Sequence, residues 1–464
     1  MLKIDNTLTP AALLPKLNRV FDLAATKIAA INGNDGGETP VFTVGGKYTS
    51  RGWTEWTQGF QYGCAILQYD ATREARFLEI GRTNTVGKMA SHVSHIGVHD
   101  HGFNNVSTYG NLLRLMNEGV LDENVWERNF YELALKITGA VQASRWTALP
   151  DGFGFIHSFN GPHSLFSDTI RSCRALVVSH QLGHALMDEQ DVKVNLLQRS
   201  IQHAETTAKY NVYYGSGRDV WDISGRVVHE SIFNVKNGCY RCPSSQQGYS
   251  PFTTWTRGHA WVLCGFPEQL EFLDRYAGAM PEVPVASERW HALSKERLME
   301  NYLNVATTVA DFYLERTPTD GIPYWDDGAP GLVNLGDWMN KAADPFNDHE
   351  PVDSSAAAIA AQGLIRLGTF LKKRGGADAG SRYLQAGLTV AARLFEEPYL
   401  SVDPTHQGLL LHSVYHQPNG WDNVPDGRKV PCGESSMWGD YHAMELALLL
   451  KRMADDQPRY TFFG

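Results

Sequence analysis

The chain has 464 residues, of which 43% are hydrophobic and 20% charged, so it is long enough to bury a large core. Its formal net charge is -10 at pH 7 and no basic face is visible, which argues against a nucleic-acid-binding protein. No apolar run approaches the roughly 20 residues that cross a bilayer. We therefore expect neither a nucleic-acid partner nor a membrane. An anionic small substrate stays possible, because its site needs only one or two local cations.

The N-terminal sequence and the cysteines bear on cellular location. Residues 1–24 lack a basic segment followed by a clean apolar stretch, so no signal peptide is predicted and we expect a cytoplasmic protein, or a periplasmic one if a leader was removed. Six cysteines are too few for a disulfide framework at this length and indicate buried thiols. Cys239 and Cys242 form a CxxC pair without a second pair, so a zinc site is not predicted there.

Helical periodicity dominates the chain. In the first helical segment Leu13, Leu17 and Phe21 share one face, and near residue 360 the small side chains of Ala357 and Ala361 would let a neighbouring helix approach closely. We predict helices near residues 10–31, 54–70, 72–90, 105–118, 123–143, 166–186, 190–210, 256–274, 294–315, 353–373, 379–396 and 435–454.

Twelve helices make six helical hairpins, which would close into an all-α (α/α)6 toroid with a few short strands in its loops. No linker divides the chain, so we predict one catalytic domain over residues 1–464. Residues 211–236 alternate and predict a short hairpin with its turn at Ser224-Gly225, and residues 405–416 predict another short strand. Long aromatic-rich loops are typical of functional segments. They span residues 144–165, 237–255, 316–352 and 417–434.

Three aspartates are candidates for chemistry. Two carboxyl groups that face a glycoside can divide the acid and base roles, because a shared pocket separates their pKa values. Asp100 and Asp168 are the candidates for such a pair. The alternative for Asp168, and for Asp353, is an ordinary helix N-cap. Asp100 is less typical of a cap, since Gly102 and Phe103 intervene before the helix.

Histidines 92, 95, 99 and 101 lie close together in the sequence, at spacings that would suit a metal site. No glutamate or cysteine partner accompanies them nearby. We therefore favour structural or substrate-contacting histidines and predict neither a metal nor another cofactor.

The segment from Trp255 to Trp261 places Arg257 between two tryptophans, with Gly258 allowing close approach of another chain. A guanidinium beside aromatic faces suits a sugar carboxylate, which it would bind with two parallel hydrogen bonds while the rings stack on the sugar. The alternative is a helix start with core tryptophans, and the pattern alone does not decide between the two.

Seven stretches, in order from about residue 50 to residue 450, resemble motifs of the unsaturated glucuronyl hydrolases of glycoside hydrolase family 88. Each motif is weak alone, but seven in order are specific. They lie at residues 56–60 (WTQGF), 98–103 (VHDHGF), 255–261 (WTRGHAW), 320–326 (DGIPYWD), 353–364 (DSSAAAIAAQGL), 410–416 (LLHSVYH) and 438–450 (WGDYHAMELALLL).

The resemblance implies an (α/α)6 barrel and a metal-free hydrolase that removes a Δ4,5-unsaturated uronic acid from the non-reducing end of oligosaccharides left by polysaccharide lyases. In that family an aspartate protonates C4 of the double bond and then helps water attack C5. Matching motifs places that aspartate at Asp168, with Asp100 as the second essential carboxylate, which favours the protonated form of Asp168. The resemblance places these residues around the substrate: His99, Trp56, Gln247, Trp255, Arg257, His259 and Trp261.

The sequence also departs from the family pattern. His101 replaces a Leu or Ile, and His259 replaces the common Gln. A family histidine expected near residues 215–220 corresponds to Arg218 or Asp219, and an expected Trp before Asp168 corresponds to Phe159. Arg218 would be an additional cation for a sulfate or a second carboxylate. The connections at residues 266–295 and 331–350 are longer than the resemblance implies.

Two other functions stay open at this point. One is a related toroid glycosidase that acts on unsaturated rhamnogalacturonyl or on saturated glucuronide substrates. The other is a toroid that binds sugar without catalysis. An oligosaccharide partner is expected in each case, whereas the linkage, the sulfation and the oligomeric state (monomer or dimer) are not predicted.

Overall fold

The computed structural model describes residues 1–32, 39–281 and 294–463. All twelve predicted helices have a counterpart there. They are α1 (Pro10–Asn32), α2 (Gln58–Thr72), α3 (Ala75–Lys88), the run of α5 (His101–Asn105), π-helix η1 (Val106–Gly110) and α6 (Asn111–Asn117), α7 (Val125–Ser144), the pair α8 (Thr169–Ser172) and α9 (Arg174–Gln181), α10 (Leu196–Tyr210), α11 (Thr256–Arg275), α12 (Lys295–Arg316), α13 (Ser354–Lys373), α14 (Ala377–Leu394) and α15 (Met437–Ala454).

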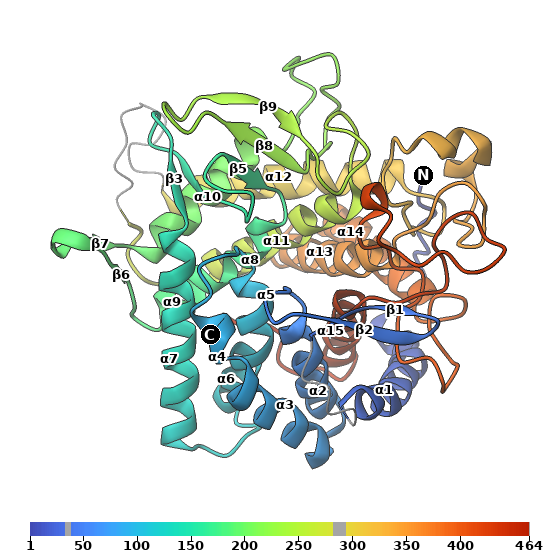
Figure 1. The fold of residues 1–464 in the computed structure, drawn as a ribbon, viewed down its shortest axis with the longest axis horizontal. Helices are drawn as coiled ribbons and strands as arrows, with labels where there is room; N and C mark the ends of the chain where they lie inside the picture. Colours follow the sequence, from blue (N-terminus) through green and yellow to red (C-terminus); the bar gives the residue numbers. More distant parts are fainter. Residues whose placement is uncertain (33–38, 282–293, 464) are drawn as a thin grey trace.

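Successive helices pack in pairs, and the last helix returns to the first. The pairs α2 with α3, α11 with α12 and α13 with α14 are in contact, and α15 packs against α1, so the ring closes (Figure 1). Helices α11, α13 and α15 are buried on nearly all sides, whereas α1, α3 and α7 keep an exposed face. The fold is therefore the predicted (α/α)6 toroid, with inner and outer helices alternating.

Small residues set how closely the inner helices approach. A Cβ added to Gly363 of α13 would lie 2.4 Å from the carbonyl oxygen of Leu263 in α11, and one added to Gly368 would lie 2.5 Å from the backbone nitrogen of Leu384 in α14. The backbones of these helices are thus nearly in contact. The predicted role of the small residues in this helix is confirmed.

The strands are short and lie in the connections. They are β1 (Thr39–Val44), β2 (Lys47–Arg51), β3 (Trp146–Ala148), β4 (Gly154–Ile156), β5 (Ser164–Phe166), β6 (Leu186–Met187), β7 (Lys193–Val194), β8 (Glu230–Phe233) and β9 (Tyr240–Ser244). They pair as β1-β2, β3-β4, β5-β8-β9 and β6-β7. Short helical turns complete the chain: α4 (Ala90–Val93), η2 (Glu189–Asp191), η3 (Pro330–Leu335), η4 (Trp338–Asn340) and η5 (Gln417–Asn419).

The strand predictions are right only in part. Residues 211–236 form a single bridge between Val212 and Val227 around the predicted turn, while β8 pairs with β5 and β9 instead. Residues 405–416 form isolated bridges rather than a ladder. The β1-β2 hairpin was not predicted. Strand β8 pairs with β5, a segment far away in the sequence, which local alternation does not reveal, whereas β1 and β2 form a local hairpin.

Three predicted helix starts were wrong. The first turn predicted from residue 54 is an irregular segment, and α2 begins at Gln58. Strand β5 occupies the start of the helix predicted from residue 166, and β6 and β7 occupy the region before α10.

The two connections that are longer than the resemblance implies contain some helical structure. In the first, residues 266–275 belong to α11 and residues 282–293 lie outside the described residues. In the second, η4 lies within residues 331–350 and η3 overlaps their start.

A buried charge network lies inside the ring. Arg171 of α8 donates to Glu268 of α11 at 3.1 Å and to Glu445 of α15 at 2.8 Å, and all three side chains are at most 4% exposed. Arg174 of α9 lies 3.6–3.7 Å from the same two carboxylates. Burial raises the pKa of Glu445, but Arg171 and Arg174 outweigh it and hold this pKa well below its usual range.

In the part of the chain that the structure describes, no helix is both long and apolar enough to cross a membrane.

We predict that Glu445→Gln lowers the free energy of unfolding by about 3 kcal/mol, because it leaves two buried guanidinium groups short of a negative charge. Glu300→Gln is the matched control, since Glu300 pairs with Arg297 at the surface with 67% of its side chain exposed, and it should change stability by less than about 0.5 kcal/mol. Urea unfolding followed by circular dichroism measures both. Equal midpoints for the two variants would contradict the stabilising role of the network.

Candidate active site

A cavity of about 420 Å³ opens at the end of the ring where the inner helices begin. Most of its lining comes from segments just before or at the start of α2, α5, α8 and α11, together with residues 415–421. Helix N-termini carry partial positive charge, so this end of the toroid favours an anionic ligand. The lining residues are Arg51, Thr54, Glu55, Trp56, His95, Gly97, Val98, His99, Asp100, Phe103, Phe159, Phe166, Asp168, Gln246, Gln247, Trp255, Arg257, Trp261, Tyr415, His416 and Trp421.

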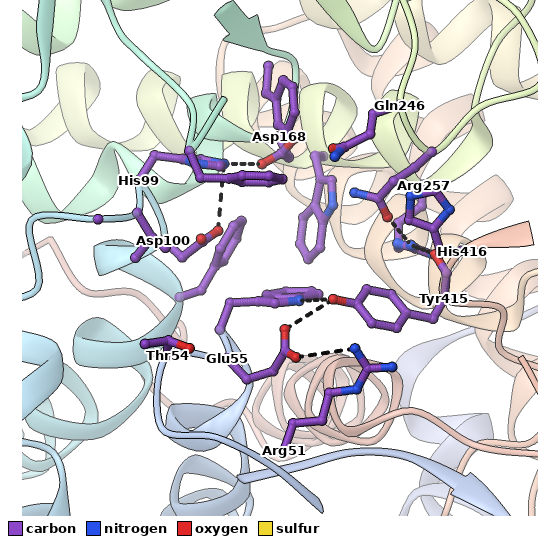
Figure 2. Close-up of a pocket in the computed structure, with 18 of the residues that line it drawn as sticks. Arg51, Thr54, Glu55, His99, Asp100, Asp168, Gln246, Arg257, Tyr415 and His416 are labelled. Carbon is purple, nitrogen blue, oxygen red and sulfur yellow. Dashed lines mark hydrogen bonds and ion pairs between the residues drawn. The ribbon is translucent and has the colours of Figure 1, made fainter. Parts of the chain in front are cut away.

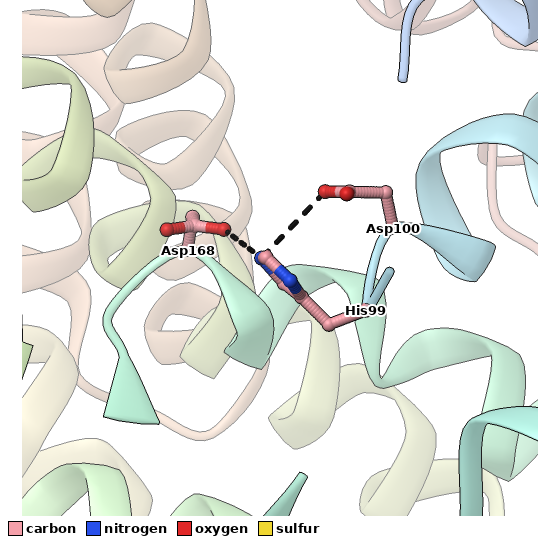
Figure 3. A group of neighbouring side chains, drawn as sticks. All are labelled: His99, Asp100 and Asp168. Atoms are coloured by element: carbon pink, nitrogen blue, oxygen red, sulfur yellow. Dashed lines mark hydrogen bonds and ion pairs between the residues drawn. The ribbon is translucent and has the colours of Figure 1, made fainter. Parts of the chain in front are cut away.

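His99, Asp100 and Asp168 meet at the deep end of the cavity (Figure 3). The Nε2 atom of His99 lies 2.9 Å from Oδ2 of Asp168 and 3.7 Å from Oδ1 of Asp100. All three residues are at most 7% exposed. Asp168 stands at the N-cap position of α8 but its side chain makes no capping hydrogen bond, so the capping alternative is wrong for this residue. For Asp353 it is right, because its carboxylate accepts from the backbone N–H groups of Ser355 and Ala356.

His229, the residue just before strand β8, also lies close to Asp168. Its Nδ1 accepts from the backbone N–H groups of Gln246 and Gln247 at 3.0 and 3.2 Å, which places its proton on Nε2. That atom lies 4.0 Å from Oδ1 of Asp168. Burial lowers the pKa of His229 to about 4, so the ring stays neutral. Neither Asp168 Oδ1 nor His229 Nε2 has a hydrogen-bond partner among the described residues.

The pKa values of His99, Asp100 and Asp168 are shifted in different directions. Burial raises the pKa of Asp100 to about 6, with His99 opposing the shift and Asp168 adding to it. For Asp168 burial also raises the pKa, but the hydrogen bond and charge of His99 outweigh it, so the pKa is lowered. Burial lowers the pKa of His99, but the two carboxylates outweigh the effect of burial, so the pKa of His99 is raised. In this arrangement His99 carries the proton nearest to Asp168, and Asp100 is the carboxyl with the raised pKa.

Arg257 lines the cavity, but its guanidinium is occupied by the protein. Its Nη1 donates to Asp353 at 2.7 Å and to the carbonyl oxygen of Val414, and its Nη2 donates to Oε1 of Gln247 at 2.8 Å and to the carbonyl oxygen of Tyr415 at 2.7 Å. These contacts leave no terminal N–H group of Arg257 for the two-pronged grip on a sugar carboxylate that was one of the two alternatives from the sequence. The bond to Oε1 of Gln247 instead fixes that amide, so that its NH₂ group is the part left for a ligand.

Aromatic rings form the walls of the cavity. Trp56, Trp255 and Trp261 line it as predicted from the sequence. Trp56 stacks on Trp438 with ring centroids 5.1 Å apart, and Trp261 packs against Phe103 at 4.8 Å. Trp438 lies behind the lining, whereas Phe103 is itself a lining residue, so the rings are held by both kinds of aromatic contact.

His259 does not reach the cavity. Its ring is buried against Phe312 and Tyr313 of the outer helix α12, with centroids 5.2 and 6.2 Å apart. Burial lowers its pKa to about 3, and the ring stays neutral. Its predicted contact with substrate is wrong, because it points from α11 toward the outer helix while Arg257 and Trp261 point inward.

Two departures from the family pattern are resolved by the structure. Arg218 does not line the cavity, because it donates to the carbonyl oxygen of Tyr210 at 2.9 Å and lies over the rings of Tyr213 and Tyr240. The histidine that the structure places beside Asp168 is His229, which lies outside residues 215–220. Phe159 lines the cavity, and its ring is stacked at 6.2 Å from that of His99.

Several lining residues at the outer end of the cavity were not named as candidates in the sequence. They are Arg51, Glu55, Tyr415, His416 and Trp421. Figure 2 shows Tyr415, Glu55 and Arg51 joined by contacts at the end opposite Asp168. Tyr415 and His416 lie within a motif recognised in the sequence, which is the one signal that pointed to this part of the lining.

A metal ion would find its ligands at the deep end. Among the described residues, His99, Asp100 and Asp168 offer ligand atoms that all lie within 4.8 Å of one another. The other histidines of this run are used elsewhere: His92 pairs with Gln58 at 2.9 Å, and His101 with the carbonyl oxygen of His95 at 2.7 Å. The histidine run is therefore not one ligand cluster.

No protein-family model matches the chain. It is 25% identical over 248 residues to an unsaturated glucuronyl hydrolase of Formosa agariphila, an alignment that covers 53% of this chain and 46% of that protein. It is 22% identical over 404 residues to an unsaturated chondroitin disaccharide hydrolase of Streptococcus agalactiae serotype III, covering 84% and 80%. The chain is a homologue of the unsaturated glucuronyl hydrolases. Its match spans about half the length of the first three curated relatives.

Solved structures support the fold over the whole chain. The unsaturated glucuronyl hydrolase of Bacillus sp. GL1 superposes with a TM-score of 0.70 at 22% identity, covering 94% of this chain and 97% of that one. A mutant of the Streptococcus agalactiae enzyme in complex with dGlcA-GalNAc6S superposes with a TM-score of 0.63 at 19% identity, covering 99% and 98%. The predicted resemblance and the toroid fold are both confirmed.

We predict that Asp100→Asn stabilises the protein, more at pH 7.5 than at pH 4.5. The folded-state pKa of Asp100 is raised from 3.8 to about 6. The folded protein therefore binds more protons than the unfolded chain in this window, and its stability falls as the pH rises through it. The neutral amide removes a penalty of at most about 3 kcal/mol above pH 6.

Thermal unfolding at the two pH values measures this effect. The exposed Asp122→Asn is the control, and it should shift the midpoint equally little at both. A midpoint for Asp100→Asn below that of the parent protein at pH 7.5 would contradict the raised pKa.

Proposed function

We propose that this chain is a glycoside hydrolase, folded as one catalytic domain, that releases a Δ4,5-unsaturated uronic acid from the non-reducing end of an oligosaccharide. One observation carries the proposal. The buried atoms Asp168 Oδ1 and His229 Nε2 are 4.0 Å apart and without partners among the described residues. Buried polar atoms without partners are costly unless a ligand satisfies them, so they mark where substrate or water would bind.

The reaction we propose is hydration of the C4=C5 double bond. Asp168 gives its proton to C4, and positive charge develops at C5, which the ring oxygen stabilises. A water attacks C5 and returns a proton to the Asp168 carboxylate. The resulting hemiketal opens and expels the remaining sugar as an alcohol, leaving a 5-keto uronic acid. The chain ends the cycle with the same protonation, so no cofactor is needed for the balance.

The proton on Asp168 needs a source, because its pKa is lowered in the free protein. His99, whose pKa is raised, lies 2.9 Å away and supports this role as the neighbouring proton donor. The carboxylate of a bound uronate would raise the pKa of Asp168 and so favour its protonated form. Asp100, ionised above its pKa of about 6, would act in the same direction.

The neighbours of this fold support the choice of substrate. One of them was solved with dGlcA-GalNAc6S, and two curated relatives carry the name unsaturated glucuronyl hydrolase. The N-terminal ends of the inner helices would favour the negative charge of the uronate. The aromatic walls suit the apolar faces of sugar rings.

We predict that Asp168→Asn lowers kcat by at least about a thousandfold, the upper part of the range for loss of a general acid and base. Loss of ultraviolet absorbance of the C4=C5 bond, with an unsaturated disaccharide as substrate, measures the rate. Asp191→Asn, at an exposed aspartate, is the matched control and should keep the parent rate. Full activity of Asp168→Asn with an unchanged circular dichroism spectrum would refute the role of Asp168, and turnover of saturated glucuronides alone would refute the reaction.

A further inference from the structure

Arg51 lies at the rim of the cavity with its donors free. It ends strand β2, and its side chain is 37% exposed. Its guanidinium carbon lies 4.9 Å from the ring centroid of Trp421, 5.7 Å from that of Phe42 and 5.9 Å from that of Tyr415. Aromatic faces on several sides fix the position of the cation without consuming its N–H groups.

The nearest carboxylate does not close this site. Oε2 of Glu55 lies 3.9 Å from Nη1 of Arg51, which is longer than a hydrogen bond. The other oxygen of Glu55 accepts from the hydroxyl of Tyr415 at 3.1 Å. Glu55 thus partly balances the charge of Arg51, while the N–H groups of the guanidinium have no acceptor among the described residues.

The lack of acceptors distinguishes Arg51 from Arg257, the other arginine that lines the cavity. The terminal N–H groups of Arg257 are all directed to protein oxygens. Arg218, the cation considered from the sequence, lies outside the cavity. Within the described lining, Arg51 is therefore the guanidinium available to an anion in the cavity.

The aromatic platform beside Arg51 is preformed. The carboxylate of Asp422 accepts from the backbone N–H groups of Tyr415 and His416 at 2.6 and 2.8 Å, which fixes the turn that carries Trp421. The amide of Asn423 donates to Glu434 at 2.9 Å. A ligand that binds here meets side chains already in position, so less ordering entropy is lost on binding.

The position of Arg51 decides which part of the substrate it meets. Asp168 and His99 lie at one end of the cavity and Arg51 and Glu55 at the other, with Tyr415 alongside the space between (Figure 2). If C4 and C5 of the uronate lie at Asp168, as in the proposed function, the sugar that leaves occupies the rim.

We propose that Arg51, held against Trp421, binds a sulfate group on the leaving sugar next to the unsaturated uronate. The inference rests on the proposed function for the orientation of the substrate. A guanidinium binds such a group with two parallel N–H···O bonds. The anion displaces only the loose contact with Glu55. Arg51 is then a residue that selects substrates, while the acid and base chemistry stays at Asp168.

The test compares an unsaturated chondroitin disaccharide sulfated on its N-acetylgalactosamine with its unsulfated counterpart. We expect the ratio of kcat/KM, sulfated to unsulfated, to fall about tenfold or more in Arg51→Met, as for loss of a charge-assisted hydrogen bond, mainly through KM. Arg51→Met keeps an unbranched apolar stem against Trp421. Arg218→Met, which removes an arginine stacked on tyrosine rings outside the cavity, should keep the parent ratio.

Equilibrium binding separates this inference from the proposed function. Calorimetry with Asp168→Asn, alone and combined with Arg51→Met, measures the affinity for the same two disaccharides without turnover. A preference for the sulfated sugar that disappears with Arg51 supports the inference, even if the wild-type protein turns over neither substrate and the proposed reaction fails. No preference, a preference that survives Arg51→Met, or an equal loss for both disaccharides overturns it, the last because Arg51 would then contact the uronate.

Discussion

The hydrogen-bonded ion pairs of Arg171 with Glu268 and Glu445 inside the ring fix the deep end of the cavity. Helix α8 has a single turn (Thr169–Ser172), and so short a helix has no stability of its own. Arg171 ties this turn to Glu268 of α11 and Glu445 of α15, two inner helices from other parts of the ring. Asp168 precedes the turn directly. Its position therefore depends on closure of the toroid rather than on local sequence.

The deep end is built at the expense of stability. Asp100 has a raised pKa because it is buried close to another carboxyl group, and the buried atoms Asp168 Oδ1 and His229 Nε2 lack partners among the described residues. Each of these features destabilises the free protein. Unpartnered buried polar atoms also occur elsewhere among the described residues, on Arg171 and Arg174 for example. What sets Asp168 apart is that it lines the cavity, where a bound ligand can reach its unpartnered oxygen.

Helical periodicity predicted the twelve helices and their closure, because each helix carries its own apolar face. The deep-end pair was also predictable: Asp100 and Asp168 belong to polar segments that begin inner helices. The error at His259 was avoidable. Arg257 and Trp261 are four residues apart and share a face of α11, whereas His259 is turned about 200° from Arg257 and must face the outer ring.

Other features could not be predicted, because they depend on contacts between distant segments. Arg257 is occupied by carbonyl oxygens 157 and 158 residues further along the chain, and no local pattern shows that. His229 reaches Asp168 because β8 pairs with β5, in a segment where the sequence indicated a local hairpin instead. Arg51 is a different case, because it comes from the local β1-β2 hairpin, which the sequence analysis missed.

The two ends of the cavity rest on different parts of the chain. The deep end is held by inner helices whose packing tolerates no added atom at Gly363 or Gly368. The rim is carried by β2 and by the loop that Asp422 and Asn423 hold in place, and both are surface connections. A substitution at the rim alters no contact of Arg171, Glu268 or Glu445. In this architecture the choice of leaving sugar can therefore change while the geometry around Asp168 stays the same, which is the arrangement expected when a rigid scaffold carries variable binding loops.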